Sequence, residues 1–410
     1  MTTRTTAAPA EAPHGVARLL AGMRDDGRPV GLQEHLGLHG PLVGGSGLIE
    51  RVTASGLRGR GGGGFPTGTK LRAVADQRKR PFTVVNGTEG EPASRKDKAL
   101  LRTVPHLVLD GALTAATAVG SREIIICIAR SAARERAVLA AALAERRDKV
   151  HWRLASIPDG FVSGEETALL SALGGRAAKP TVKPPYPFER GLDNAPSLVQ
   201  NAETLAHVAL IARHGPGWFR SLGTETEPGT ALVSLSGAVR RPGVYEIELG
   251  TPLQGLIAQA GGPSEQIDAY LVGGYFGGWT READLRLTAS SGLGAGVVVA
   301  LPTATCALAE TARIARYLAN ESAGQCGPCA RGLAALAGGL EQLASGKYDD
   351  RSRLARWAQQ VAGRGACHHP DGAARFVTSA LATFAAETDT HLKHRRCRHR
   401  DRGVLRAAGA

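Results

Sequence analysis

Apolar residues recur in two patterns over the first half of the chain. Short apolar runs bounded by polar residues are typical of buried strands, and apolar residues three or four positions apart are typical of amphipathic helices. These patterns predict short helices within 16–54, the last over 48–56, then strands over 81–86, 123–129 and 151–157 and helices over 69–77, 106–120 and 133–147. Strands that alternate with helices predict an α/β layer with a largely parallel sheet.

A second unit begins near Gly229, where the pattern changes. The predicted elements are strands over 230–239, 243–249, 269–275 and 296–302 and a helix over 252–262, which together make a small α+β module. From Ala307 onward the pattern is helical almost throughout, with predicted helices over 307–321, 329–345, 351–363 and 374–392. Successive amphipathic helices predict a helical bundle.

Length and polarity narrow the class of protein. A chain of 410 residues is long enough for two or three domains of roughly 100 to 200 residues each. No run of about 18 apolar residues predicts a membrane span, and the polar start "MTTRTTAAPAEAPHG" lacks the apolar core of a secretory signal. We therefore expect a cytoplasmic protein with no direct membrane insertion and a disordered tail over residues 1–15.

The positive charge is concentrated at the end of the chain. The formal net charge is +13, and residues 391–410 carry seven Lys or Arg against one Asp, which amounts to +6. Aromatic residues make up only 4% of the chain, so few side chains are available to stack on bases. We expect no nucleic-acid binding, and a basic tail over 391–410 that either docks on an acidic partner or only adds solubility.

The stretch "SGLRGRGGGGFPTGTK", Ser55 to Lys70, contains seven glycines in sixteen residues. Gly63 and Gly68 have the spacing of a Walker A loop, but Thr69 and Lys70 stand in the reverse order. That reversal turns the lysine roughly 100° around a helix, away from the phosphates, so an ATP or GTP site is not expected. Four consecutive glycines are entropically costly, which favours a ligand that approaches the backbone over a plain surface loop.

Three polar clusters are predicted at strand or helix ends, where α/β sheets bind ligands. They are "NGTEGEP" after the first strand, "SGEETALL" at a predicted helix start, and "QNAETL", Gln200 to Leu205. Taken singly, each is equally compatible with helix capping, because a glutamate in the first turn is favourable without a ligand.

The cysteines are too few for a disulfide framework and are unevenly placed. Cys326 and Cys329 form "CGPC", and Cys367 lies in "GACHHPDG". Cys127 lies in the predicted strand "EIIICIA", where cysteine usually serves as a small apolar residue.

Together these motifs resemble a known family. The glycine loop, "NGTEGEP", "SGEETALL", "KPPYP" and "ESAGQCGPC" follow one another as in the flavin-bearing, NADH-oxidising subunit of bacterial respiratory complex I and its relatives in NAD-dependent formate dehydrogenases and hydrogenases. The resemblance covers roughly residues 45–390. It implies an α/β FMN/NADH-binding domain over 16–228, a β-grasp module of the soluble ligand-binding type over 229–304, and a helical iron–sulfur bundle over 305–390.

The resemblance also implies roles for individual residues. Hydride transfer from NADH to FMN needs cofactors held face to face and no protein nucleophile, because the cofactors carry the chemistry. Glu91 and Glu166 would lie on the nicotinamide side as the catalytic pair, and Phe65 and Tyr186 would stack with the NADH adenine. The remaining implied cofactor-binding residues are Gly59, Arg60, Gly61, Gly62, Gly63, Gly64, Lys70, Asn86, Glu89, Gly164, Glu165, Asn201 and Thr204.

The chain departs from the family pattern at several positions. Thr88 stands where the family carries an aspartate and Gln200 where it carries an asparagine, and both keep hydrogen-bonding capacity. Ala323 replaces the first of four cluster cysteines, whereas Cys326, Cys329 and Cys367 match the other three. Because alanine cannot ligate iron, two alternatives remain open. In one, the cluster persists as a 4Fe-4S cluster with a non-cysteine ligand such as His368, Ser322 or solvent, or as a 3Fe-4S cluster. In the other, the cluster is lost and the cysteines are relics, a zinc site or a thiol pair.

The expected function is NADH oxidation, with electrons passing from FMN through an iron–sulfur cluster to a partner. The partner would be another oxidoreductase subunit or an acidic ferredoxin-like acceptor, which would suit the basic tail. The alternative is a non-catalytic scaffold or ligand-binding subunit with a degenerate flavin or cluster site.

Overall fold

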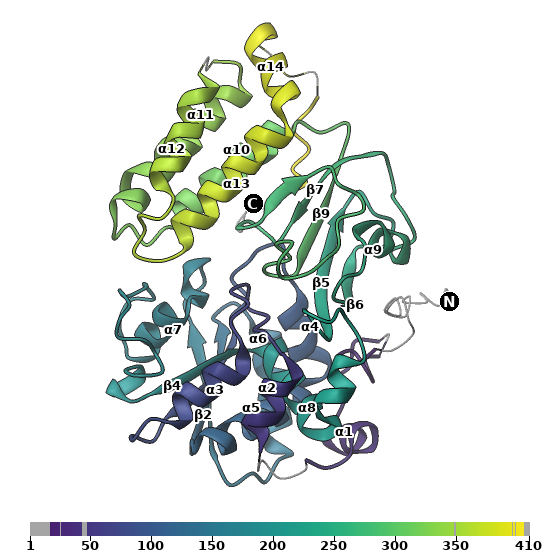
Figure 1. Cartoon of the computed structure of the whole chain (residues 1–410), viewed down its shortest axis with the longest axis vertical. Helices are drawn as coiled ribbons and strands as arrows, with labels where there is room; N and C mark the ends of the chain where they lie inside the picture. Colours follow the sequence, from purple (N-terminus) through teal and green to yellow (C-terminus); the bar gives the residue numbers. More distant parts are fainter. Residues whose placement is uncertain are drawn as a thin grey trace.

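A computed structural model of the chain describes residues 17–24, 26–42, 47–347, 350–395, 397 and 399–405. Figure 1 shows three parts: an α/β part that contains β1–β4, a second sheet that contains β5–β9, and a group of helices, α10–α14. The tail expected over residues 1–15 lies outside the described residues.

The α/β part is built on a parallel sheet. Within the described residues its strands are β1 (Phe82–Gly87), β2 (Glu123–Ala129), β3 (His151–Ile157) and β4 (Ser197–Asn201), in the order β3-β2-β1-β4. The first three match the predicted strands, whereas β4 was not predicted. Both faces of the sheet are covered, which explains why β2 is apolar and buried along most of its length, whereas the edge strand β3 is mostly half-buried or exposed.

Alternate residues of the strands pack against different helices. Val85 and Ile126 join the larger core with α5 and α8, whereas Val84 and Cys127 join a smaller core with α7 on the opposite face. Cys127 is fully buried there, which confirms its expected role as a small apolar residue. The helices of this part are α1 (Leu32–His39), α2 (Leu48–Ser55), α3 (Thr67–Ala75), α4 (Lys96–Thr103), α5 (Pro105–Val119), α6 (Ala133–Ala144), α7 (Glu166–Leu173) and α8 (Ala202–Arg220), with short 3-10 turns η1 (Val162–Gly164) and η2 (Leu192–Asn194).

The second sheet mixes parallel and antiparallel strands. Within the described residues its order is β6-β5-β9-β7-β8. Its elements are β5 (Thr230–Gly237), β6 (Gly243–Glu248), α9 (Leu253–Gln259), β7 (Ile267–Val272), β8 (Gly278–Thr280) and β9 (Val297–Pro302). Val298 faces the core shared with α9, and Val299 faces the core shared with the C-terminal helices. The sheet therefore lies between these two layers.

The C-terminal helices pack on one another and on this sheet. They are α10 (Ala307–Asn320), a π-helical turn η3 (Pro328–Gly332), α11 (Leu333–Ala344), α12 (Arg351–Val361), α13 (His369–Thr383) and α14 (Ala385–His394). The predicted helix over 374–392 is divided between α13 and α14, because the helix stops at Phe384. No helix among the described residues combines the length and apolarity needed to cross a bilayer.

The expected basic tail overlaps helix α14, which runs to His394. Where the structure describes residues after α14, they contact this chain. Leu405 is 2% exposed, and its backbone N–H donates to Glu310 Oε2 at 2.9 Å. Arg402 pairs with Glu265 at 2.6 Å. Arg402, one of the cations expected to meet an external partner, is thus paired with a carboxylate of this chain.

Candidate functional site

The strand order of the parallel sheet reverses between β1 and β4. We call the region at the carboxyl ends of these two strands the crevice, after the place where open α/β sheets bind ligands. In an open α/β sheet, ligands bind outside the carboxyl ends of the strands where the order of the chain reverses, and here that point lies between β1 and β4. Asn86, the last residue but one of β1, lies in direct register with Asn201 at the end of β4. Two of the predicted polar clusters therefore meet at this edge.

The glycine-rich loop closes on itself beside the crevice. The backbone N–H of Gly59 donates to the carbonyl of Phe65 at 2.9 Å. The loop is fastened to the start of α8, because the Arg60 N–H donates to Thr204 Oγ1 at 2.8 Å. A Cβ built on Gly61 would lie 3.3 Å from Asn201 Cβ, so this position leaves little space for a side chain. The predicted loop and the "QNAETL" cluster are in contact.

Asn86 links the first cluster to the "SGEETALL" segment. Its Nδ2 donates to the Gly164 carbonyl at 2.8 Å, and its Oδ1 accepts from Thr88 Oγ1 at 2.8 Å. A Cβ on Gly164 would come within 2.8 Å of Thr88 Oγ1. Glycine at this position therefore permits the close approach between the two segments.

Two of the predicted carboxylates act as helix caps. Glu89 has φ 45° and accepts from the backbone N–H groups of Asp97 at 2.9 Å and Lys98 at 3.0 Å, at the start of α4. Burial raises the pKa of Glu89. Glu165 caps α7, because it accepts from the N–H groups of Thr167 at 2.8 Å and Ala168 at 3.0 Å. Cofactor contacts by these two residues stay a prediction.

Glu166 carries the negative charge of the crevice. Its carboxylate pairs with Lys70 at 2.9 Å and with Lys183 at 2.7 Å. Burial opposes ionisation, but the two ammonium groups lower the pKa of Glu166 to about 2. The glycine loop and the "SGEETALL" segment are thus joined by an ion pair that stays charged at neutral pH.

Glu91 lies at the contact between the α/β part and the second sheet. It accepts from the backbone N–H of Tyr275 at 2.8 Å and from that of Ala93 at 3.1 Å. Burial raises the pKa of Glu91 to about 7. Gly274 has φ +80°, and a Cβ there would lie 2.6 Å from the Glu91 carboxylate, so glycine permits this contact.

The predicted aromatic residues are exposed. Phe65 is 55% exposed, and Tyr186 is 45% exposed and stacks on Phe188 with ring centroids 5.4 Å apart. Exposed aromatic rings of this size are available to a planar ligand. Their expected role with adenine stays a prediction.

The remaining predicted residues are the three cysteines of the helical part. Burial raises the pKa of Cys329 and, together with the neighbouring Cys326 and Cys367 thiols, brings it to about 12. Ala323 lies in the loop before η3, and the side chain of His368 is 95% exposed. The structure therefore gathers three thiols and supplies no fourth at position 323.

The cysteine region contacts the turn that precedes the "SGEETALL" segment. The backbone N–H of Phe161 donates to Glu321 Oε2 at 2.7 Å, which joins this turn to the start of "ESAGQCGPC". The charge of Glu165 also acts on the Cys367 thiol, whose pKa is raised mainly by burial. The crevice and the cysteines are therefore neighbours.

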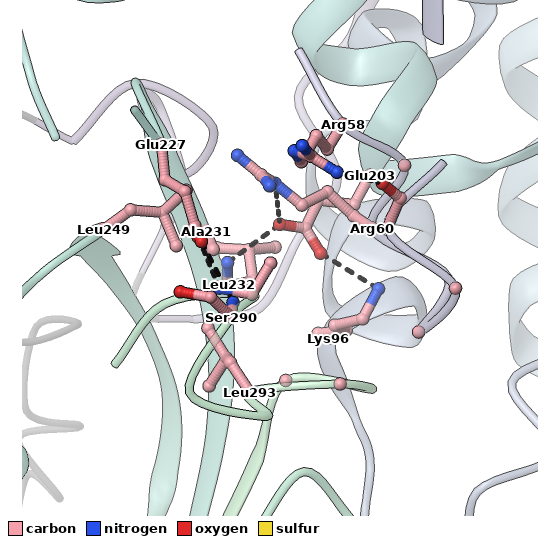
Figure 2. A pocket seen from close by; sticks show the side chains of 17 residues that line it. Arg58, Arg60, Lys96, Glu203, Glu227, Ala231, Leu232, Leu249, Ser290 and Leu293 are labelled. Carbon is pink, nitrogen blue, oxygen red and sulfur yellow. Dashed lines mark hydrogen bonds and ion pairs between the residues drawn. The ribbon is translucent and has the colours of Figure 1, made fainter. Parts of the chain in front are cut away.

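A cavity of ≈ 260 Å³ lies on another side of the glycine loop, toward the second sheet (Figure 2). Five predicted cofactor-binding residues of the loop line it, whereas Lys70, Asn86 and Gly164 do not; the five are Gly59, Arg60, Gly62, Gly63 and Gly64. Its residues include Arg58, Arg60, Lys96, Glu203, Leu232 and Ser290.

The charges of this cavity are matched internally. Lys96 pairs with Glu203 at 2.9 Å and with Asp97 at 2.8 Å, and Arg60 lies 3.9 Å from Glu203. Sequence reasoning missed this pairing, because Lys96 belongs to no motif and lies far along the chain from Glu203, which stands within the "QNAETL" cluster but was given no role. Glu203 contacts the glycine loop through Arg60.

Three segments of the chain match models of known protein families. Residues 52–210 match the Nuo51 FMN-binding domain, residues 232–274 the SLBB domain, and residues 309–391 the NADH-ubiquinone oxidoreductase-F iron-sulfur binding region. The chain is 33% identical over 377 residues to the NADH-quinone oxidoreductase F 2 subunit of Rhizobium meliloti, across 85% of this chain and 90% of that one. It is 34% identical over 377 residues to the NADH-quinone oxidoreductase F subunit of Streptomyces coelicolor, across 85% and 84%.

Solved structures agree with these matches. The fold is similar to that of a chain in the NAD+-reducing [NiFe]-hydrogenase in the H2-reduced state, with a TM-score of 0.80 and 31% identity. The similarity covers 94% of this chain and 68% of that chain.

Proposed function

Because the chain belongs to the family of NADH-quinone oxidoreductase F subunits, we propose that it oxidises NADH at an FMN held in the crevice between β1 and β4. By family the chain is an NADH dehydrogenase component with an FMN-binding domain and an iron–sulfur binding region. The observation that carries the placement is that separate motifs converge there. Arg60 binds Thr204, Asn86 binds Gly164, and Lys70 binds Glu166.

The residues of the crevice fit a flavin that carries a phosphate. A Cβ built on Gly63 or Gly64 would meet no atom within 4 Å, so the loop backbone is open to a ligand at these two positions. Gln200 is 6% exposed, and its Nε2 is buried without a hydrogen-bond partner among the described residues, so it offers a donor to a ligand. Lys70 offers a positive charge to the phosphate. Its present partner Glu166 is also paired with Lys183, so Glu166 would remain paired when Lys70 binds the phosphate.

We assign roles within the crevice as follows. When bound, FMN accepts a hydride from NADH and releases the electrons singly. Lys70 and the loop amides would hold the phosphate end, and Asn86 and Asn201 the polar edge of the ring. Glu91 and Glu166 would position the nicotinamide, with Phe65 and Tyr186 at the adenine. The chain's contribution is orientation and electrostatics, so no nucleophile is required.

The proposed electron exit is the cysteine region. Cys326, Cys329 and Cys367 fit three corners of an iron–sulfur cluster by donor type, because thiolates are the usual iron ligands. The contact between Phe161 and Glu321 keeps this region beside the crevice. With alanine at position 323, the site suits a 3Fe-4S cluster or a 4Fe-4S cluster with one non-cysteine ligand.

We further propose the architecture and setting that this role needs. Residues 16–228 would form the FMN/NADH domain, 229–304 a β-grasp module and 305–390 a helical iron–sulfur bundle. The chain would work in the cytoplasm and join a membrane complex only through partners. Other oxidoreductase subunits are the expected acceptors, and an acidic ferredoxin-like protein is the alternative that residues 391–410 would suit.

The test is flavin content and NADH-dependent dye reduction in protein purified without oxygen. Lys70→Ala should lose flavin, whereas Lys149→Ala, which removes an exposed lysine in the loop before β3, should retain it. Wild-type protein with no flavin spectrum and no dye reduction would favour the scaffold alternative. Normal flavin content in Lys70→Ala would refute the placement of the phosphate.

A further inference from the structure

A second group of metal-ligating side chains lies away from the three expected cluster cysteines. It consists of Cys306, Glu387, His391 and Cys397, whose ligand atoms all lie within 4.8 Å of one another. Cys306 is the N-cap of α10, Glu387 and His391 are one turn apart on α14, and Cys397 follows α14. Residues more than 80 positions apart in the chain thus converge on one point.

The distances suit a single small ion. Cys306 Sγ lies 3.7 Å from His391 Nε2, and His391 Nε2 lies 3.8 Å from Glu387 Oε1. A tetrahedral zinc ion, with bonds of about 2.3 Å to sulfur and about 2.0 Å to nitrogen or oxygen, places its ligands roughly 3.3 to 3.8 Å apart. These donors therefore need only a small contraction to enclose the ion.

The histidine is already oriented as a metal ligand. His391 is fully buried, and its Nδ1 lies 3.2 Å from the Leu343 carbonyl. With the proton on Nδ1, that nitrogen donates to the carbonyl and Nε2 presents its lone pair to the cysteine. This second hydrogen bond is the usual support of a zinc-bound histidine.

The contacts of the other donors are compatible with a metal ion. Glu387 Oε1 is buried and has no hydrogen-bond partner among the described residues. Backbone N–H groups point at both sulfur atoms, since Ala309 donates to Cys306 Sγ and His399 donates to Cys397 Sγ, each at 3.3 Å.

We propose that Cys306, Glu387, His391 and Cys397 bind one Zn²⁺ ion. Two thiolates, one imidazole and one carboxylate complete a tetrahedron and leave no open position, so the site is structural rather than catalytic. Binding releases the two thiol protons to solvent, with no change in oxidation state.

The ion ties the end of the chain to the start of α10. After Cys397, the carbonyl of Arg400 accepts from the Cys306 N–H at 3.0 Å. The N–H groups of Val404 and Leu405 both donate to the buried carboxylate of Glu310 at 2.9 Å. Zinc would fix Cys397 and residues 399–405 against α10, at a place separate from Cys326, Cys329 and Cys367.

The experiment measures zinc in full-length protein purified with reductant and without oxygen. Wild type should contain about one zinc per chain by elemental analysis. His391→Gln should lose it, whereas His394→Gln, on the exposed side of the same helix, should keep it. Flavin content should be equal in both variants, which separates this proposal from the one about FMN.

A second measurement covers the case in which His391→Gln does not fold. Wild-type protein is stripped with a chelator and titrated with Co²⁺, which should give the visible absorption of a tetrahedral site with thiolate ligands. A Cys306→Ser variant should bind Co²⁺ with a weaker thiolate band. The proposal is overturned if wild type holds no zinc and stripped protein gives no tetrahedral cobalt spectrum, or if mass spectrometry finds Cys306 and Cys397 joined as a disulfide.

Discussion

The change Gly164→Ala tests the crevice most sharply. A Cβ at this position would lie 2.8 Å from Thr88 Oγ1, which is itself held by Asn86 at 2.8 Å. The threonine has few rotamers available, so the backbone of η1 must shift. That shift would weaken the bond from Asn86 to the Gly164 carbonyl. Overpacking of this kind costs about 1–3 kcal/mol, which sets an upper limit of roughly 5- to 150-fold on the loss of FMN affinity.

The assay is titration of flavin-free protein with FMN, followed by quenching of flavin fluorescence. The control is the double variant Thr88→Ala with Gly164→Ala, in which the obstructing oxygen is gone. Its affinity should be close to that of Thr88→Ala alone, because the two positions are in contact and their effects are not additive. Wild-type affinity in Gly164→Ala, or no recovery in the double variant, would refute the reasoning.

Three further predictions concern burial, charge and the cluster. Burial raises the pKa of Glu91 from 4.5 to about 7, so the folded state holds the proton more tightly and stability falls as pH rises through that interval. The Glu91→Gln variant has no carboxyl group to titrate at this position. The difference between its melting temperature and that of wild type should therefore increase as the pH rises from about 4.5 to about 7. A difference that does not change with pH would contradict this. Lys96→Ala strands two buried carboxylates and should cost about 3–5 kcal/mol of stability in denaturant titrations, whereas Lys98→Ala should change it little. Ala323→Cys should alter the EPR spectrum of the reduced protein by supplying a fourth thiolate, and an unchanged spectrum would argue against a cluster there.

The sequence predicts individual helices and strands better than it predicts how they are arranged around one another. The strands over 123–129 and 151–157 were predicted with the bounds that the structure has. The first is a nearly continuous run of isoleucines, and the second is marked off by the polar loops on either side. Strands β4 and β8 were missed, because five and three residues are too few to establish a period. The break at Phe384 was missed because the helical pattern continues through it.

For the site too, the sequence predicted individual residues better than it predicted their arrangement in space. The motifs pointed to Asn86 and Asn201, but only the strand order places these residues opposite one another. Glu89 and Glu165 illustrate the capping alternative that sequence left open, since both carboxylates accept hydrogen bonds from a helix start. The group around Cys306 carries no sequence signal, because its ligands come from segments that meet only after folding.

The most direct test of the central claim is an anaerobic titration of the purified protein with NADH, followed by absorbance and then EPR. The account predicts that NADH bleaches the flavin absorbance and that a paramagnetic iron–sulfur signal appears, which is lost in Cys329→Ser while the bleaching remains. An unbleached flavin in the presence of excess NADH would contradict it.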